Sequence, residues 1–372
     1  MITRVRFQNF KALRDVQIDF TAPLTVFVGP NACGKTSVLQ AVSLLTQFAV
    51  EGNESPLHIP SDLVSRQGMG DLSMHARFAV GRRSLEYSAA VVMPSSVSPG
   101  KLLFCVVPPH MSDAAPAGAM PSTTRSVELV RFGIRPTGLL RLDPVVLAKP
   151  SYTGDKAPRL GDDGAGLASV LAETATADPA RFAQIQDALR AVIPAVKQVR
   201  LLRTSVEYTV QTHDPAGDPT IERRKGQGHK IHFDFQGADK VPADQASEGT
   251  LLVLGWLTAL LGEGGRSLLL IDDLDRGLHP KAQAELIAIL RRLLAQNPDL
   301  QIVATSHSPY LLDKLKPDEI RLMTLDDEGA ALCGALSEHP DYPRWKDLML
   351  PGEAWSTLGE GWLKGRAPKT DA

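Results

Sequence analysis

The sequence predicts an α/β fold in which a phosphate-binding loop joins a buried strand to a helix. Residues 24–28 form the apolar run of a buried strand, and residues 38–45 have the apolar periodicity of a helix. The segment between them has the phosphate-loop pattern G-x-x-x-x-G-K-[ST], at Gly29, Gly34, Lys35 and Thr36. Because this motif requires a strand before it and a helix after it, we interpret it as a nucleoside triphosphate site.

The residue types of this loop, GPNACGKTS, suit phosphate binding. Glycines let backbone N–H groups curl around phosphate oxygens, and the N-terminus of the following helix adds a favourable dipole. We expect Lys35 to reach the β- and γ-phosphates of ATP and the Thr36 hydroxyl to hold Mg²⁺. Cys33 is interpreted as a small filler, whose alkylation would block ATP binding if its thiol were exposed. The expected nucleotide-binding residues are Gly29, Pro30, Asn31, Ala32, Cys33, Gly34, Lys35, Thr36 and Ser37.

The composition is that of an ordinary globular protein. Hydrophobic residues make up 43% of the chain, charged residues 22%, and the net charge is −2, so no global basic field indicates nucleic acid. The longest apolar run, residues 251–261, is too short to span a bilayer, and the first ten residues have no secretory apolar core. The 3 cysteines are too few and too scattered for a disulfide framework or a zinc site. We therefore expect a cytoplasmic protein with no membrane partner.

A second apolar strand ends in carboxylates. Residues 267–272, SLLLID, have the form of a Walker B strand, whose terminal carboxylate lies beside the phosphate loop. We assign Asp272 to orienting Mg²⁺ and Asp273 to positioning the attacking water as a general base. An isolated Asp pair after an apolar run would more often begin an exposed loop. Because the chain also has the phosphate loop, we prefer the Walker B interpretation.

Two further segments suit contact with the γ-phosphate. Ser247 in ASEGT caps a predicted helix, and without the other motifs we would assign it no further role. In a nucleotide-binding dimer, however, the Ser247 hydroxyl and the Gly249 N–H would meet the γ-phosphate held by the partner subunit. His307 follows the predicted strand 301–305, and we expect it to contact the γ-phosphate or the attacking water. A lone histidine in such a loop would more often be a bystander, but the order and spacing of the motifs favour the functional role.

These motifs, taken in order, resemble the heads of ABC-type ATPases, and within that class the OLD-like and RecF-like AAA-family ATPases. The resembling segments are RFQNFKAL, GPNACGKTS, RLGDDGAGLASVL, ASEGTLLVL, LLLIDDLDRGLHP and ATSHSPYLL. The resemblance implies a two-lobed head, a homodimer with two ATP molecules between phosphate loop and signature, and Mg²⁺-dependent hydrolysis. It also implies that Lys11, in the turn after the first strand, leans toward the nucleotide, although a surface lysine is an equal alternative.

The chain departs from this family pattern in three ways. The usual Asp-Glu-Pro-Glu is replaced by Asp272-Asp273-Leu274-Asp275, and the shorter Asp273 predicts slow hydrolysis rather than none. OLD nucleases continue into a metal-binding nuclease domain, for which the segment after His307 is too short. We therefore expect Asp326-Asp327-Glu328 to form a turn between strands. RecF itself is not expected to carry the GLHP and SHSP elements, so the chain is interpreted as a relative of the repair protein.

The expected organisation is a two-lobed ATPase head with a mixed β subdomain and an inserted helical segment. The ATPase core comprises residues 1–60 and 241–330. Residues 61–150 form a β-rich lobe with a flexible loop at 108–126, and residues 151–240 form an insertion with two helices and two strands. Residues 331–372 are a tail with three of the chain's 4 tryptophans.

Three further features of the sequence are weaker evidence of function. For each, a structural explanation is preferred to the functional one or is equal to it. The tryptophans of the tail are expected to pack on the head rather than to dock a partner protein. A basic cluster is assigned to the tip of a hairpin, where solvation is favoured over DNA contact. Gln67 is a candidate Q-loop glutamine in a poor context. The basic cluster consists of Arg223, Arg224, Lys225, His229 and Lys230.

We therefore expect an ATPase that drives a protein effector, a nuclease or toxin supplied in trans, in bacterial DNA maintenance or anti-phage defence. One alternative is an ATP-gated scaffold or DNA-binding clamp with little turnover. The other is a transporter ATPase subunit. The long separation of the phosphate loop from ASEGT, and that signature itself, argue against the transporter.

Overall fold

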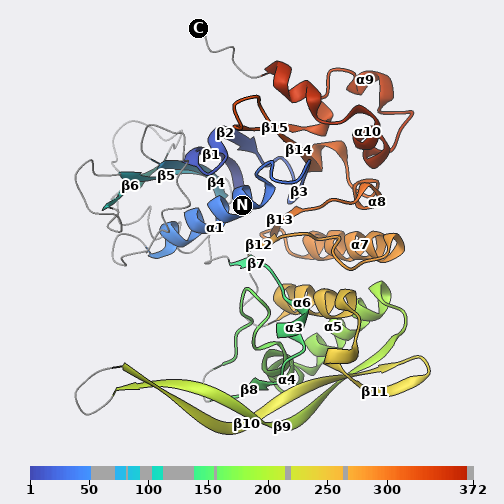
Figure 1. Cartoon of the computed structure of the whole chain (residues 1–372). Helices are drawn as coiled ribbons and strands as arrows, with labels where there is room; N and C mark the ends of the chain where they lie inside the picture. The colour runs from blue at the N-terminus through green and yellow to red at the C-terminus, as the bar shows by residue number, and fades with distance from the viewer. Residues whose placement is uncertain are drawn as a thin grey trace. The chain divides into compact units, whose positions relative to one another are not determined.

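The computed structural model describes residues 1–51, 72–80, 83–92, 103–111, 138–154, 157–213, 219–262 and 267–366 of the chain. The protein consists of two compact units, coloured by residue number in Figure 1. The first unit comprises Met1–Leu139, Ser267–Asp275 and Leu290–Ala372, and the second Leu140–Arg266 and Arg276–Ile289. The segment boundaries expected from the sequence stay predictions.

The first unit contains a six-stranded sheet with the strand order β15-β14-β3-β13-β12-β7. β3, β12, β13 and β14 run parallel to one another, while β15 pairs with β14 in the antiparallel sense. Every residue of β3, β12 and β13 is buried, as the continuous apolar runs of the sequence predicted. The strands are β3 (Leu24–Val28), β7 (Leu139–Leu140), β12 (Leu268–Ile271), β13 (Gln301–Thr305), β14 (Ile320–Leu325) and β15 (Ala331–Ala335).

An antiparallel sheet of order β2-β1-β4-β5-β6 forms the other β layer of this unit. Its strands are β1 (Ile2–Phe10), β2 (Leu13–Asp19), β4 (Leu72–Val80), β5 (Arg83–Val92) and β6 (Leu103–Met111). Helix α1 (Lys35–Glu51) shares one apolar core with β1, β2 and β4. The buried Gln301 side chain joins the two sheets, because it accepts a hydrogen bond from Ile2 N at 2.8 Å and donates one to Ile2 O at 2.9 Å.

The strands expected between residues 75 and 107 are confirmed as β4, β5 and β6. The loop expected at 108–126 is wrong in its first part, because β6 continues through Met111 in register with β5. Two prolines in this segment, Pro108 and Pro109, favoured a loop in the sequence. The rest of the expected loop lies outside the described residues.

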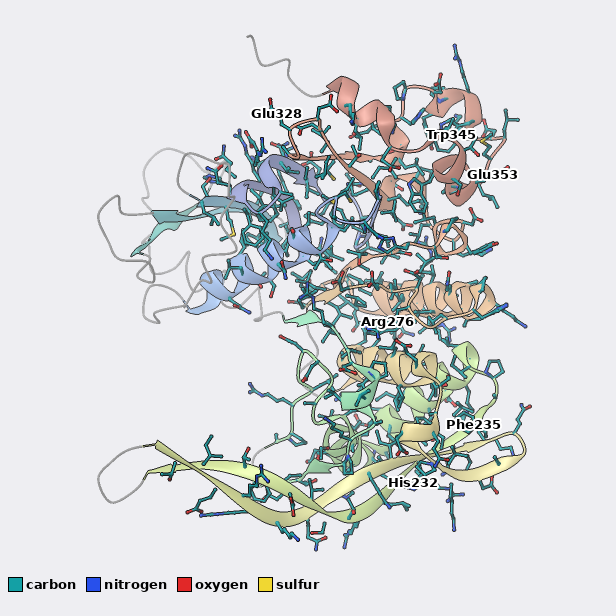
Figure 2. The ribbon with its side chains drawn as sticks, viewed as in Figure 1. His232, Phe235, Arg276, Glu328, Trp345 and Glu353 are labelled. Carbon is teal, nitrogen blue, oxygen red and sulfur yellow. The ribbon has the colours of Figure 1, made fainter. Side chains whose placement is uncertain are left out.

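The tryptophan-containing tail packs on the first unit, as the preferred interpretation expected. Trp345 is 5% exposed, and its ring centroid lies 5.0 Å from that of Tyr342 (Figure 2). Gly352 N donates to Asp313 Oδ1 at 2.8 Å, which fixes the start of α10. The elements are α8 (Pro309–Leu312), η4 (Pro317–Glu319), η5 (Leu336–Glu338), α9 (Tyr342–Trp345), α10 (Pro351–Leu358) and η6 (Gly361–Arg366).

The expected turn at residues 326–328 is also confirmed. Asp326 Oδ1 accepts hydrogen bonds from Glu328 N at 3.0 Å and Ala330 N at 2.7 Å, between β14 and β15. Figure 2 labels Glu328 at this turn. The carboxylate of Asp326 therefore stabilises the turn itself.

The second unit is a helical layer on a long β ribbon (Figure 1). Helix α6 is buried along most of its length, because its sequence is apolar on all sides. The two helices expected within residues 167–196 are confirmed as α4 and α5. The helices are α3 (Pro144–Leu147), α4 (Leu167–Ala177), α5 (Pro179–Val192), η3 (Ala243–Gln245) and α6 (Glu248–Leu261). Helix α7 (Pro280–Gln296) begins in this unit and ends in the first.

The ribbon corrects one expectation from the sequence. Its strands are β8 (Ser151–Tyr152), β9 (Val196–His213), β10 (Pro219–Phe235) and β11 (Ala238–Pro242), in the order β11-β10-β8 with β9 on β10. β9 and β10 pair from Val196 and Phe235 out to His213 and Pro219, so the basic cluster lies within β10 and not at a hairpin tip. Its charges suggested a turn, but both faces of a ribbon can carry solvated side chains.

Cross-strand pairing explains why the polar segment is a strand. Lys225 on β10 pairs with Glu207 on β9 at 3.4 Å. Within β10 itself, Arg224 pairs with Glu222 at 2.9 Å. The rings of Tyr208 and Tyr152 stack with centroids 3.8 Å apart. Such pairs stabilise exposed strands. They also offset part of the positive charge, which weakens the argument for DNA contact.

Candidate nucleotide-binding site

In the phosphate loop, between β3 and α1, the backbone has positive φ angles at which a side chain causes strain. Gly29, Ala32 and Gly34 have φ angles of +147°, +62° and +100°. A Cβ atom at Gly29 would lie 2.0 Å from the carbonyl oxygen of Met323 in β14, so only glycine fits there. Alternation of left-handed residues with ordinary ones is how a backbone turns successive N–H groups toward one anion.

Lys35 is held against this loop. Its Nζ donates to Gly29 O at 2.9 Å and to Pro30 O at 2.8 Å, and the residue is 7% exposed. The loop carbonyls therefore solvate the ammonium group where a phosphate would lie. Cys33 is 2% exposed, and burial raises the pKa of its thiol, so it has the properties of the expected filler and not of a reactive thiol.

Thr36 and Asp272 meet at the start of α1 and the end of β12. The Thr36 hydroxyl lies 3.1 Å from each oxygen of the Asp272 carboxylate. A hydroxyl and a carboxylate are the hard oxygen ligands that Mg²⁺ takes together with substrate phosphates, so this pair fits that ion. Nowhere in the described part of the chain, this site included, is a group of three or more His, Cys, Asp and Glu side chains arranged to hold a metal.

Asp273 follows Asp272 in an uncommon backbone conformation. Its φ is +56°, and its N–H donates to Thr305 Oγ1 at 2.8 Å. Burial raises the pKa of its carboxyl above the ordinary value, and the neighbouring Asp272 raises it further, while His307 lowers it. A carboxylate with a raised pKa is a better proton acceptor, so the environment suits the general base expected from the sequence.

His307 lies beside Asp273, on the loop after β13. Its Nε2 is 3.9 Å from Asp273 Oδ1, and its backbone N–H donates to Asp275 Oδ1 at 3.0 Å. The structure thus brings Thr36, Asp272, Asp273 and His307 together at the carboxyl ends of neighbouring parallel strands. This is where ligands bind in open α/β sheets.

Two residues of this site were not singled out in the sequence. Thr305 contacts both Asp272 and Asp273, and Asp275 holds the backbone of His307. Thr305 was visible only as the last residue of a predicted strand, and Asp275 only as part of the DDLD string. Nothing in either pattern says that the two loops contact each other.

Lys11 contacts the helix that follows the phosphate loop. It has a φ of +51°, and its Nζ donates to Gln40 Oε1 in α1 at 2.7 Å. Gln40 lies one helical turn beyond Thr36, so Lys11 is close to the phosphate loop. The contact of Lys11 with a nucleotide stays a prediction. Gln67 lies outside the described residues.

Ser247 and Gly249 belong to the second unit, at the start of α6. Ser247 Oγ accepts from Thr250 N at 3.2 Å, which makes it the N-cap that its sequence predicted. A Cβ at Gly249 would lie 2.3 Å from Gly277 O, so the residue must be glycine. Glu248 pairs with Arg276 at 2.6 Å, which fixes the helix start against the loop before α7 (Figure 2).

Family models match both parts of the sequence that carry these residues. Residues 1–67 match "AAA ATPase domain", and residues 150–313 match "AAA domain, putative AbiEii toxin, Type IV TA system". The first match contains the phosphate loop. The second contains Ser247, Asp272, Asp273 and His307. No helix among the described residues is both long enough and apolar enough to cross a bilayer.

The chain is also similar to three named proteins. It is 34% identical over 98 residues to the DNA replication and repair protein RecF of Acaryochloris marina, covering 24% of this chain and 25% of that protein. It is 21% identical over 346 residues to the Septu protein PtuA of Bacillus mycoides, covering 89% and 41%. It is 35% identical over 65 residues to the OLD nuclease of Thermus scotoductus, covering 18% and 12%. The chain spans less than half the length of each relative.

Proposed function

The chain carries AAA-family ATPase domains homologous to those of RecF, PtuA and the OLD nuclease, and on this basis we propose that it is a Mg²⁺-dependent ATPase that dimerises around ATP. The observation that carries the proposal is the convergence of Thr36, Asp272, Asp273 and His307 on one edge of the parallel sheet. A structural role alone would not require two adjacent carboxylates and a histidine there.

Each residue has a distinct part in the proposed hydrolysis. Backbone N–H groups of the loop and the Lys35 ammonium bind the phosphates, and Thr36 with Asp272 holds Mg²⁺. The bound ion supplies positive charge that offsets the charge of the phosphate oxygens. Asp273 orients a water and accepts its proton as the water oxygen bonds to the γ-phosphorus and the bond to the β–γ bridging oxygen breaks. His307, next to Asp273, contacts the γ-phosphate.

Hydrolysis is expected to be slow. Asp273 is one methylene shorter than glutamate, the residue usual in this family, so its carboxylate stops short of the glutamate position. Extending it as Asp273→Glu tests this directly. The substitution keeps the charge and increases only the reach, so turnover should rise if reach limits the rate.

The complete site is proposed to form between two copies of the chain. Ser247 and Gly249 of one copy would meet the γ-phosphate held by Lys35 of the other. The capped start of α6 supports this, because the N-terminus of a helix is a suitable anion site. The dimer is proposed to act on a protein effector supplied in trans, a nuclease or toxin, in bacterial DNA maintenance or anti-phage defence. The named relatives and the toxin family model support this setting.

The decisive experiment compares ATP turnover, with and without Mg²⁺, in the wild type, Asp273→Ala and Asp273→Glu. We expect Asp273→Ala to lower turnover by ~100-fold, in the range typical of a lost general base. Light scattering of the same proteins measures ATP-dependent dimerisation. Turnover near zero in both the wild type and Asp273→Ala, with ATP-dependent dimers in both, would instead support the alternative of an ATP-gated scaffold.

A further inference from the structure

We infer that Thr305 is a positioning residue that holds the two carboxylates of Asp272 and Asp273 in their working orientation. The inference rests on the hydrolysis proposed above. It concerns a residue outside the phosphate loop and the ASEGT segment, which acts through its contacts with the residues that follow β12.

Thr305 contacts three consecutive residues after β12. Its hydroxyl donates to Asp272 Oδ1 at 2.8 Å and accepts from the Asp273 N–H at 2.8 Å. Its carbonyl oxygen accepts from Leu274 N at 2.9 Å. Thr305 itself is fully buried at the end of β13. The end of β13 therefore holds both the Asp272 carboxylate, which faces Thr36, and the backbone of Asp273, the proposed base.

The hydrogen bonds to Thr305 hold Asp273 in a conformation that few residues other than glycine adopt. The φ of Asp273 is +56°, in the left-handed region. The N–H groups of residues 273 and 274 both donate to Thr305, one to its hydroxyl and one to its carbonyl oxygen. Without the hydroxyl, a partly buried N–H would lose its acceptor, and the backbone would gain by relaxing. The direction of the Asp273 side chain would change with it.

The single hydroxyl proton also distinguishes the two carboxylates. Thr305 Oγ1 lies 2.8 Å from Asp272 Oδ1 but 3.5 Å from Asp273 Oδ1. The proton is therefore donated to Asp272, and this hydrogen bond fixes the direction in which that carboxylate points. The hydroxyl therefore orients Asp272 through its side chain and Asp273 through its backbone N–H.

A second contact fixes the same pair of loops, so the role of the hydroxyl can be tested alone. His307 N–H donates to Asp275 Oδ1 at 3.0 Å, which holds the loop after β13 to the loop after β12. Thr305→Val keeps the shape and β-branching of the side chain but removes the hydroxyl. Thr305→Ser keeps the hydroxyl and removes only a methyl group. The two variants separate hydrogen bonding from packing.

We expect Thr305→Val to lower kcat by ~10–100-fold, as for other residues that orient a reacting group, while Thr305→Ser stays within ~3-fold of the wild type. The equilibrium Kd for ATP, measured by fluorescence titration with Mg²⁺ present, should change by less than ~3-fold in both variants, because the phosphate loop is intact. The loss in Thr305→Val should therefore appear in kcat and not in the Kd for ATP, and the hydroxyl of Thr305→Ser should preserve kcat.

The outcomes separate this inference from the function on which it rests. Wild-type turnover no higher than that of Asp273→Ala contradicts the proposed hydrolysis and with it the inference. Clear wild-type turnover that Thr305→Val leaves unchanged contradicts the inference alone, as does a loss of kcat in Thr305→Ser equal to that in Thr305→Val. Should Thr305→Val fail to fold, Thr305→Cys replaces the hydroxyl with a weak S–H donor at the size of the serine variant. A kcat equal to that of Thr305→Ser would then overturn the inference.

Discussion

The Oδ1 atom of Asp273 lies 3.9 Å from the Nε2 atom of His307, across two loops that follow neighbouring parallel strands. Burial and the charge of Asp272 raise the pKa of the Asp273 carboxyl, and the histidine only partly opposes that shift. The native protein therefore holds this carboxylate in a less favourable environment than water. Such a residue is expected to sustain a function at the expense of stability.

The stability of Asp273→Asn provides the first test. Because the native pKa of Asp273 is raised, the folded state binds this proton more readily than the unfolded state does. Its contribution to stability is therefore largest at low pH and is lost as the pH rises through the native pKa. Asp273→Asn should unfold at a higher temperature than the wild type near neutral pH. The difference should shrink as the pH falls through the raised native pKa toward the ordinary value of 3.8. Calorimetry across this range would contradict the environment described if the variant were less stable at neutral pH.

The phosphate loop should not tolerate a side chain at Gly29. Gly29→Ala places a methyl group 2.0 Å from Met323 O at a φ of +147°, so both a clash and a strained backbone result. The matched control is Gly329→Ala, where φ is +80° and no atom lies within 4 Å. We expect the control to lose ~1 kcal/mol of unfolding free energy and Gly29→Ala to lose at least ~2 kcal/mol, together with ATP binding. Urea denaturation measures both. Equal losses would mean that the loop relaxes around the added methyl.

Lys35 should be required for ATP binding. Lys35→Ala removes the ammonium group that the carbonyls of Gly29 and Pro30 now hold in the loop. The loss of this charge should weaken ATP binding by at least ~10-fold, since charge-assisted hydrogen bonds to phosphate are the strong ones. Lys364→Ala, which removes an exposed lysine paired with Asp327, is the control and should leave the Kd unchanged. Isothermal titration with ATP and Mg²⁺ gives both values, and a similar Kd for the two variants would exclude the loop as the binding site.

Two substitutions at Ser247 distinguish its role in helix capping from contact with a phosphate. Ser247→Ala removes the cap of α6 and should cost ~1 kcal/mol of unfolding free energy. Ser247→Asp keeps a capping oxygen and suits the helix dipole, so it should leave stability nearly unchanged. Its negative charge would nevertheless repel a γ-phosphate, so ATP turnover should be lost.

A mixing experiment then tests whether the site is shared between copies. Ser247→Asp and Lys35→Ala are each expected to be inactive alone. A mixed dimer would contain one site with the intact Lys35 of the first variant and the intact Ser247 of the second. Turnover that reappears on mixing supports a composite site. Its absence, when native mass spectrometry shows mixed dimers, would place the whole site within one copy.

Local patterns predicted the strands and loops that carry much of the candidate site. Residues 24–36 and 267–273 each combine an apolar strand with the polar residues that follow it, and the structure places the two strands in one sheet, on either side of β13. The prediction failed at residues 212–213 and 219–229, where polar composition indicated a turn but cross-strand pairs form a ribbon. Pairing partners lie on another strand, and composition along one strand does not reveal them.

The sequence by itself determined the phosphate loop, the strand that ends at Asp272 and Asp273, and the loop that carries His307, because each is a local pattern of burial and chemistry. Only the tertiary structure decided that one Thr305 hydroxyl joins Asp272 to Asp273, and that Asp275 holds the backbone of His307. The reason is geometric. A hydrogen bond between two loops depends on the register of β12 with β13, and that register is fixed by packing across the whole sheet.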